Sequence, residues 1–240
     1  MKQLLAAAWL KVWADLAEQR RYPIQFFFGW VTTGAVLWGL GLAAARTSGQ
    51  EASTGALATY VAMGAVSLFY LIPRLLTVGQ DHPPEEVMLY PYPLSRLVAV
   101  LTAVSALQIG VGLVGIYVLA ALAVTRHLPD LGYVAGAMAL ALFSVAGVGF
   151  IVFALKLVFR KVDSLATLVQ VGLFALAFTP TLAYGWAAAV PLAGAIRWLR
   201  DPSTPALPVL VFSLLWLAVG LWAVSRAERV VVNRGVAAYE

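Results

Sequence analysis

The stretch Gly79–Arg96, with the sequence GQDHPPEEVMLYPYPLSR, separates two apolar segments that are each long enough to cross a lipid bilayer. Ionisable side chains are costly in hydrocarbon, and this stretch carries Asp81, His82, Glu85 and Glu86. The sequence therefore predicts a water-exposed loop at a membrane surface. Four large, mainly apolar side chains that are stabilised by burial follow the acidic pair: Val87, Met88, Leu89 and Tyr90. A short amphipathic segment of this kind is a suitable docking surface for a soluble partner.

The composition of the chain excludes a water-soluble globular protein. Hydrophobic residues make up 62% of the sequence and charged residues only 11%, against about 45–50% and 25% in soluble domains. The chain has no cysteine, which removes disulfides and thiolate metal sites. Its net charge of +5 comes from basic residues near the ends of apolar segments. That distribution is typical of the basic residues that orient a membrane protein in the bilayer and not of a nucleic-acid-binding surface, so no nucleic-acid partner is expected.

Residues 1–22 are predicted to form an amphipathic helix that lies in the plane of the lipid headgroups. Lys11 and Asp15 share one helical face, and Trp9 and Trp13 lie on another. Tryptophans at the boundary and charges toward water are typical of interfacial helices. The basic start followed by an apolar run also resembles a signal peptide, but the charges interrupt it, and we expect the segment to be retained.

The rest of the chain predicts an all-α, polytopic membrane protein with a single transmembrane domain over residues 1–240. A spanning helix needs about 20 mainly apolar residues, and six segments meet this condition. The expected spans cover about 24–45, 56–78, 97–124, 131–159, 164–186 and 209–225. Residues 187–208 contain four prolines and three charges. We therefore expect a re-entrant or interfacial segment before the last span.

The positions of the basic residues predict the orientation of the chain. Six spans place both termini and the loop 79–96 on one side, and twelve of the sixteen basic residues fall on that side. The other four are Arg46, Arg126, Arg197 and Arg200. Because basic residues concentrate on the cytoplasmic side, both termini and the loop are predicted to be cytoplasmic, in a multi-pass protein of the cell membrane.

Motifs that would supply energy or catalysis are missing from the sequence. No Asp, Glu or His falls at an expected mid-membrane position, which argues against ion-driven transport. No G-x-x-x-x-G-K-[ST] loop is present, and the G-x-G-x-x-G at 110–115 lies within a span, where small residues favour close helix packing. The two histidines lie on opposite membrane faces, so no metal site is expected. Gln108 and Gln170 are candidates for bonds between helices, which we favour, or for a transport pathway.

With these residues placed, the chain resembles a permease subunit of a type-2 ATP-binding-cassette (ABC) exporter over nearly its whole length. The resemblance rests on the order of the amphipathic helix, RRYP before the first span, PLSR before the third, VPLAGAIRWLRD before the last, and the tail RAERVVVNRG. Members of that family commonly carry a Gly-Thr-Leu-Glu-like core in the loop. Here DHPPEEVMLYPYP stands instead, which leaves open which loop residues contact the ATPase.

The resemblance implies a half-transporter that pairs with a second copy of itself or with a homologous permease. Two separate ATPase subunits, which hold the ATP and Mg²⁺, would dock on the loop around Glu85–Tyr90 and on the N-terminal helix. This chain would carry no cofactor and would not itself be an enzyme. The scarcity of fixed charges in the spans suits a lipid-like, amphipathic or drug-like substrate.

Two other functions stay open from the sequence. A stand-alone facilitator or lipid scramblase would need no ATPase partner. An intramembrane enzyme is disfavoured because catalytic groups are missing from the spans. Export as opposed to import follows from the resemblance alone. The sequence leaves open whether the pair is a homodimer or a heterodimer.

Overall fold

The computed structural model describes residues 9–10, 12–14, 17, 20–24, 93–125, 131–159, 167–169, 171–173, 176, 184–200, 203 and 205–234. These residues form helices and turns and contain no strand. The main elements are α6 (Leu94–Thr125), α7 (Leu131–Val158), α9 (Tyr184–Ala189), α10 (Ala193–Arg200) and α11 (Ala206–Arg234). The expected spans 24–45 and 56–78 lie outside the described residues, apart from residue 24.

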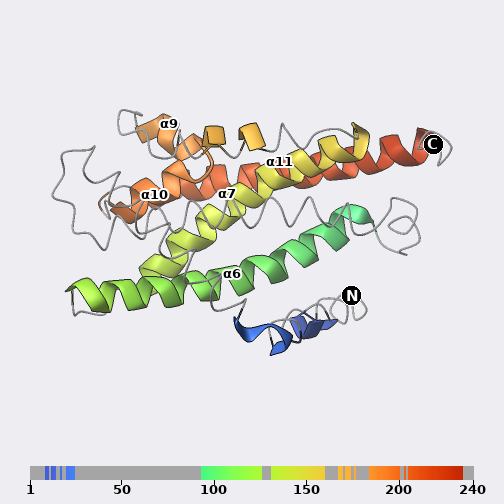
Figure 1. Ribbon diagram of the computed structural model, residues 1–240. Helices are drawn as coiled ribbons and strands as arrows, with labels where there is room; N and C mark the ends of the chain where they lie inside the picture. Colours follow the sequence, from blue (N-terminus) through green and yellow to red (C-terminus); the bar gives the residue numbers. More distant parts are fainter. Residues whose placement is uncertain are drawn as a thin grey trace.

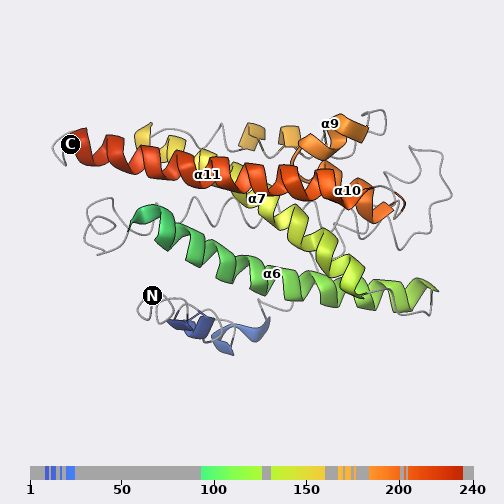
Figure 2. The same ribbon diagram turned by 180° about the vertical axis from the view of Figure 1, so that it is seen from behind.

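Helices α7 and α11 cross in the centre of the described part, and α11 packs chiefly on α7 (Figures 1 and 2). The two helices run in the same direction, and α6 runs in the opposite direction beside them. The short helices α9 and α10 lie near the beginning of α7. We call the end that holds the start of α6 and the C-terminal ends of α7 and α11 the loop end, and the end that holds α9 and α10 the hairpin end.

Two glycines allow the backbones of α7 and α11 to touch where the helices cross. A Cβ atom added to Gly147 would lie well inside 3.0 Å of the backbone of Trp216 and Leu217. A Cβ atom added to Gly220 would meet the carbonyl group of Gly147 just as closely. Small residues let helices approach in this way, and in a bilayer such packing is the main source of helix association.

The buried core is centred on α7. Val145, Phe150 and Phe153 are each at most 1% exposed, and most of the helix from Ala137 to Ala154 is buried. Residues of all four other helices complete this cluster, including Val98 of α6 and Val224 of α11. α7 is therefore the most buried helix of the described part, and α6, α10 and α11 pack against it.

Within the described part of the chain, two helices are long and apolar enough to cross a bilayer, Leu131–Val158 and Ala206–Asn233. At about 1.5 Å per residue, each is roughly 42 Å long, which exceeds the 30 Å of a hydrocarbon core. α11 differs from α7 because large apolar side chains stay exposed along one of its faces: Leu207, Val211, Leu214, Leu215 and Trp222. This combination of length, composition and exposure favours membrane association.

Three boundaries differ from those expected from the sequence. α6 begins at Leu94, inside the stretch assigned to the loop, because the first turn follows directly from Pro93. α11 continues to Arg234, well past the expected limit of 225. The sequence 209–234 contains neither proline nor a glycine that must end the helix, and the mixed polar and apolar residues 226–234 extend the same helix. α9 straddles the expected boundary at 186 between the fifth span and the following segment.

Gly110 and Gly115 make no close contact with another described helix, although the sequence suggested one. A Cβ atom on Gly110 would be 3.6 Å from Leu142 Cδ1, an ordinary contact, and one on Gly115 would meet no atom of the described residues within 4 Å. The close contact is made by Gly147 and Gly220.

Substitution of Gly147 by alanine should destabilise the protein, because its methyl group would collide with backbone atoms that cannot rotate away. Overpacking of this kind costs about 1–3 kcal/mol. We expect a lower thermal unfolding temperature, measured by circular dichroism in detergent. Gly115→Ala is the matched control, since its methyl group enters open space and alanine favours the helix by about 1 kcal/mol. Equal unfolding temperatures for Gly147→Ala and the unaltered protein would contradict the crossing.

Candidate functional site at the loop end of the bundle

The stretch Gly79–Arg96, expected from the sequence to be a loop, enters the described part of the chain at Pro93 and the first turn of α6. The carbonyl oxygen of Pro93 accepts hydrogen bonds from the backbone N–H groups of Arg96 (2.9 Å) and Leu97 (3.2 Å). Pro93 thus stands at the N-cap position, where the carbonyl group already takes part in the helix. The end of the loop is therefore fixed in direction by the helix that follows it.

Glu228 of α11 holds the first residue of α6. The backbone N–H group of Leu94 donates a 2.9 Å hydrogen bond to Glu228 Oε1 across 134 residues of sequence. The first N–H groups of a helix have no partner within the helix, and the positive end of the helix dipole attracts a carboxylate. Glu228 satisfies one of these groups from a different helix.

Apolar packing surrounds this hydrogen bond. Leu94 and Val98 of α6 belong to the same buried cluster as Val224 and Ala227 of α11. Val98 and Val224 are completely buried. The start of α6 and the last third of α11 are therefore joined by both a polar and an apolar contact.

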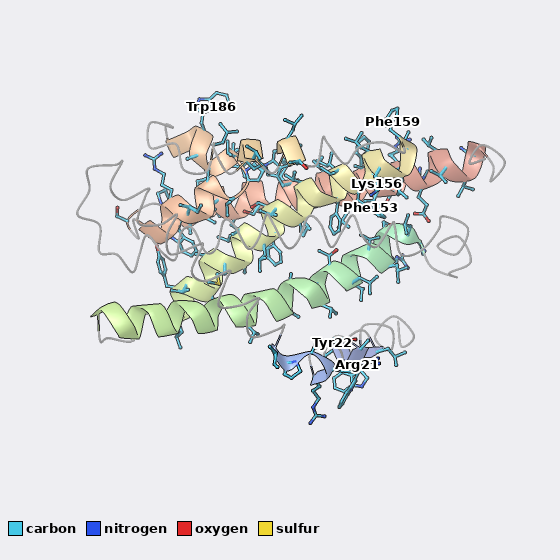
Figure 3. The ribbon with its side chains drawn as sticks, viewed as in Figure 1. Arg21, Tyr22, Phe153, Lys156, Phe159 and Trp186 are labelled. Carbon is cyan, nitrogen blue, oxygen red and sulfur yellow. The ribbon has the colours of Figure 1, made fainter. Side chains whose placement is uncertain are left out.

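Basic residues gather at the loop end. Arg96, Lys156, Arg226 and Arg229 all lie there, on three different helices, whereas Arg197 lies on α10 at the hairpin end. Figure 3 shows Lys156 and Phe159 at the C-terminal end of α7, far from Trp186 on α9.

Exposed tryptophans occur toward both ends of the described helices. The guanidinium carbon of Arg226 lies 5.6 Å from the centre of the Trp222 ring, and Trp222 is 62% exposed. Trp186 is 73% exposed at the hairpin end. Tryptophans in such positions, with an arginine on the outer side, are typical of the boundary between membrane and water.

The short helices α9 and α10 and the tight turn between them, which together we call the hairpin, are held to the bundle by hydrogen bonds. Leu192, between α9 and α10, is fully buried and has a φ angle of 72°, a left-handed conformation that is uncommon for leucine. Its N–H group donates a 3.1 Å hydrogen bond to Ser144 Oγ of α7, which itself donates to the carbonyl oxygen of Ala141. Trp216 Nε1 of α11 donates to the carbonyl oxygen of Ala189 at 2.8 Å. The turn thus contacts both central helices.

The outer part of the hairpin packs on the beginning of α7. The rings of Tyr133 and Trp198 meet edge to face with centroids 4.8 Å apart, and the Tyr133 hydroxyl donates a hydrogen bond to the carbonyl oxygen of Trp198. A Cβ atom on Gly194 would lie 3.0 Å from Cα of Ala188, so glycine permits α9 and α10 to approach closely.

Several residues predicted from the sequence lie outside the described part of the chain. These are the docking residues Glu85, Glu86, Val87, Met88, Leu89 and Tyr90, together with Lys11, Asp15 and Gln170. Gln108 lies within α6. Trp9 and Trp13 are both exposed, and their rings meet edge to face at 6.0 Å, as expected for residues one helical turn apart.

Sequence reasoning did not single out the residues that join the elements: Glu228, Ser144, Leu192, Gly147 and Gly220. Glu228 carried one signal, because it is an acidic residue in an otherwise basic tail. Ser144 is the only serine or threonine in the long apolar helix α7, and nothing local shows that it accepts a hydrogen bond from residue 192.

The described residues of this end supply contacts between helices. They contain no group of three or more His, Cys, Asp or Glu side chains that could hold a metal ion. What the geometry provides is an all-helical bundle with a basic end, to which the exit of a polar loop is attached. The chain matches no protein-family model, no curated protein and no solved structure.

Replacement of Ser144 by alanine should loosen the hairpin, because the buried N–H group of Leu192 would lose its acceptor. An unsatisfied buried donor costs about 1–3 kcal/mol. We expect faster hydrogen–deuterium exchange of peptides that cover residues 184–200, measured by mass spectrometry. Ser225→Ala is the control, since that hydroxyl bonds only the carbonyl oxygen of Leu221 in its own helix. Unchanged exchange in Ser144→Ala would show that Ser144 does not hold the turn.

Proposed function

We propose that the chain is the membrane-spanning permease subunit of an ATP-driven exporter of the type-2 ABC class. It would move a lipid-like, amphipathic or drug-like substrate out of the cytoplasm or the inner leaflet. The work would come from ATP hydrolysis on separate subunits.

The observation that carries this proposal is the attachment of the polar loop to the basic end of the bundle. The loop exit at Pro93–Arg96 is joined to the last third of α11, and the ends of α7 and α11 bring Lys156, Arg226 and Arg229 to the same end. Basic residues favour the cytoplasmic side of a membrane. A loop fixed there is placed to receive a cytoplasmic partner.

The missing energy source supports a separate partner. The sequence has no phosphate-binding loop and no ionisable group at an expected mid-membrane position. In this proposal the chain pairs with a second permease, which is either another copy of itself or a homologous protein. Two ATPase subunits bind ATP and Mg²⁺, and one of them docks on each permease. The two permease halves then move as rigid bodies between two states.

The proposed orientation is that of a multi-pass protein of the cell membrane with both termini in the cytoplasm. Six spans, the interfacial helix of residues 1–22 and a re-entrant or interfacial segment at 187–208 belong to the same proposal. The support for them is the pattern of apolar and basic residues along the chain.

Co-expression with a candidate ATPase, a nucleotide-binding protein encoded near this chain if one is found there, tests the proposal. We expect the two to purify as a complex whose ATP hydrolysis differs from that of the ATPase alone. Lipid or solute movement by the purified chain in vesicles without nucleotide would instead favour a stand-alone facilitator or scramblase.

Replacement of Val87, Met88, Leu89 and Tyr90 by glycine and serine should abolish binding of the ATPase, because the apolar contact surface of the loop is lost. Binding is measured by size-exclusion chromatography of the mixture and the fold by thermal unfolding, which should change little. Leu131→Ser serves as the control, since Leu131 is exposed at the hairpin end. Unchanged affinity in the fourfold variant would show that the docking residues lie elsewhere.

A further inference from the structure

Glu228 is the only acidic residue in the described part of the chain. It lies between Arg226 and Arg229, in the C-terminal part of α11, where the helix dipole favours cations. The neighbouring helix offsets this unfavourable location, because the Glu228 carboxylate faces the N-terminal end of α6 and accepts a hydrogen bond from the backbone N–H group of Leu94. The side chain is therefore suited to a contact between helices.

The contact lies at the point where the loop becomes a helix. The carbonyl oxygen of Pro93 accepts hydrogen bonds from the N–H groups of Arg96 and Leu97, and the N–H group of the next residue, Leu94, donates to Glu228. Without this hydrogen bond, the first turn of α6 would be held to α11 by apolar contacts alone, such as those of Leu94 and Val98. Apolar contacts are not directional, so the turn could shift along α11.

From α11 a continuous series of contacts reaches the opposite end of the bundle. Gly220 touches the backbone of Gly147 in α7, and one turn away Ser144 holds the N–H group of Leu192 in the hairpin. These contacts are backbone packing and buried hydrogen bonds, which transmit displacement with little deformation. The start of α6, α11, α7 and the hairpin therefore form one body as long as Glu228 holds α6.

We propose that Glu228 is a positioning residue that makes the start of α6 and the end of α11 move together, so that a push on the loop 79–93 displaces the whole bundle. The source of the push rests on the proposed function, whereas the mechanical link between the two helices does not. Loss of a hydrogen bond to a charged group shifts the ratio of joined to separated states by roughly 10- to 150-fold.

The link can be tested on the chain alone, because the sequence has no cysteine and two introduced ones can be labelled uniquely. Nitroxide labels at Ser95→Cys and Val232→Cys report the distance between the start of α6 and the end of α11 by pulsed electron paramagnetic resonance. We expect a narrow distance distribution in the otherwise unaltered chain in lipid nanodiscs. Glu228→Ala should broaden it, and Glu228→Gln, which keeps the acceptor oxygen without the charge, should fall between the two.

A second variant removes the donor in place of the acceptor. Proline is tolerated at the first position of a helix and lacks the N–H group, so Leu94→Pro should broaden the distribution as Glu228→Ala does. Leu94→Ala keeps the N–H group and removes the apolar side chain, and it should broaden the distribution less. Arg229→Gln controls for the loss of a charge. If Glu228→Ala leaves the distribution unchanged, or if Leu94→Ala broadens it as much as Leu94→Pro, the hydrogen bond does not join the helices and the proposal is wrong.

The role in transmission is tested with the ATPase that co-purifies with the unaltered chain. Glu228→Ala should bind the ATPase with unchanged affinity, because Glu85–Tyr90 are intact, and should no longer alter its ATP hydrolysis. A merely structural role would instead lower affinity and thermal stability together, and that result would overturn the proposal. So would equal effects of Glu228→Ala and the unaltered chain on hydrolysis, although the proposed function would then stand. If the unaltered chain does not bind the ATPase, the proposed function fails and the label distances still decide the link.

Discussion

The contact between the backbones of α7 and α11 at Gly147 and Gly220 determines the arrangement of the described helices. Because the two helices cross without intervening side chains, the contact sets the distance between them, and both helices run in the same direction. Their C-terminal ends therefore lie at the same end of the bundle, and α6 begins beside them. The grouping of Arg96, Lys156 and Arg226 at that end is a consequence of this crossing.

Polar contacts occur where the chain departs from simple helix packing. Ser144 and Trp216 hold the turn between α9 and α10, and Glu228 holds the start of α6. Each satisfies, or is satisfied by, a backbone group that the local helix leaves free. Buried backbone groups without partners are costly, which explains why these few side chains lie at the joints of an otherwise apolar bundle.

The sequence predicted the helical nature of the chain and the approximate limits of the helices at 97–124 and 131–159, because apolar length alone determines them. It did not predict that α11 reaches Arg234, since hydropathy falls at Ser225 although helix propensity does not. The joints at Glu228, Ser144 and Gly147 could not be predicted either. Each depends on a partner 48 to 134 residues away, or on a helix whose rotation no local pattern reveals.

The sidedness of the two bundle ends is the claim on which the account depends, and impermeant maleimide labelling tests it most directly. Single cysteines at Ser203, in the turn before α11, and at Val232, near its C-terminal end, would be introduced into the cysteine-free chain. The account predicts that the cysteine at 203 reacts in intact cells and that the one at 232 reacts only after the membrane is opened. Reaction of both from the same side, or the reverse pattern, would contradict it.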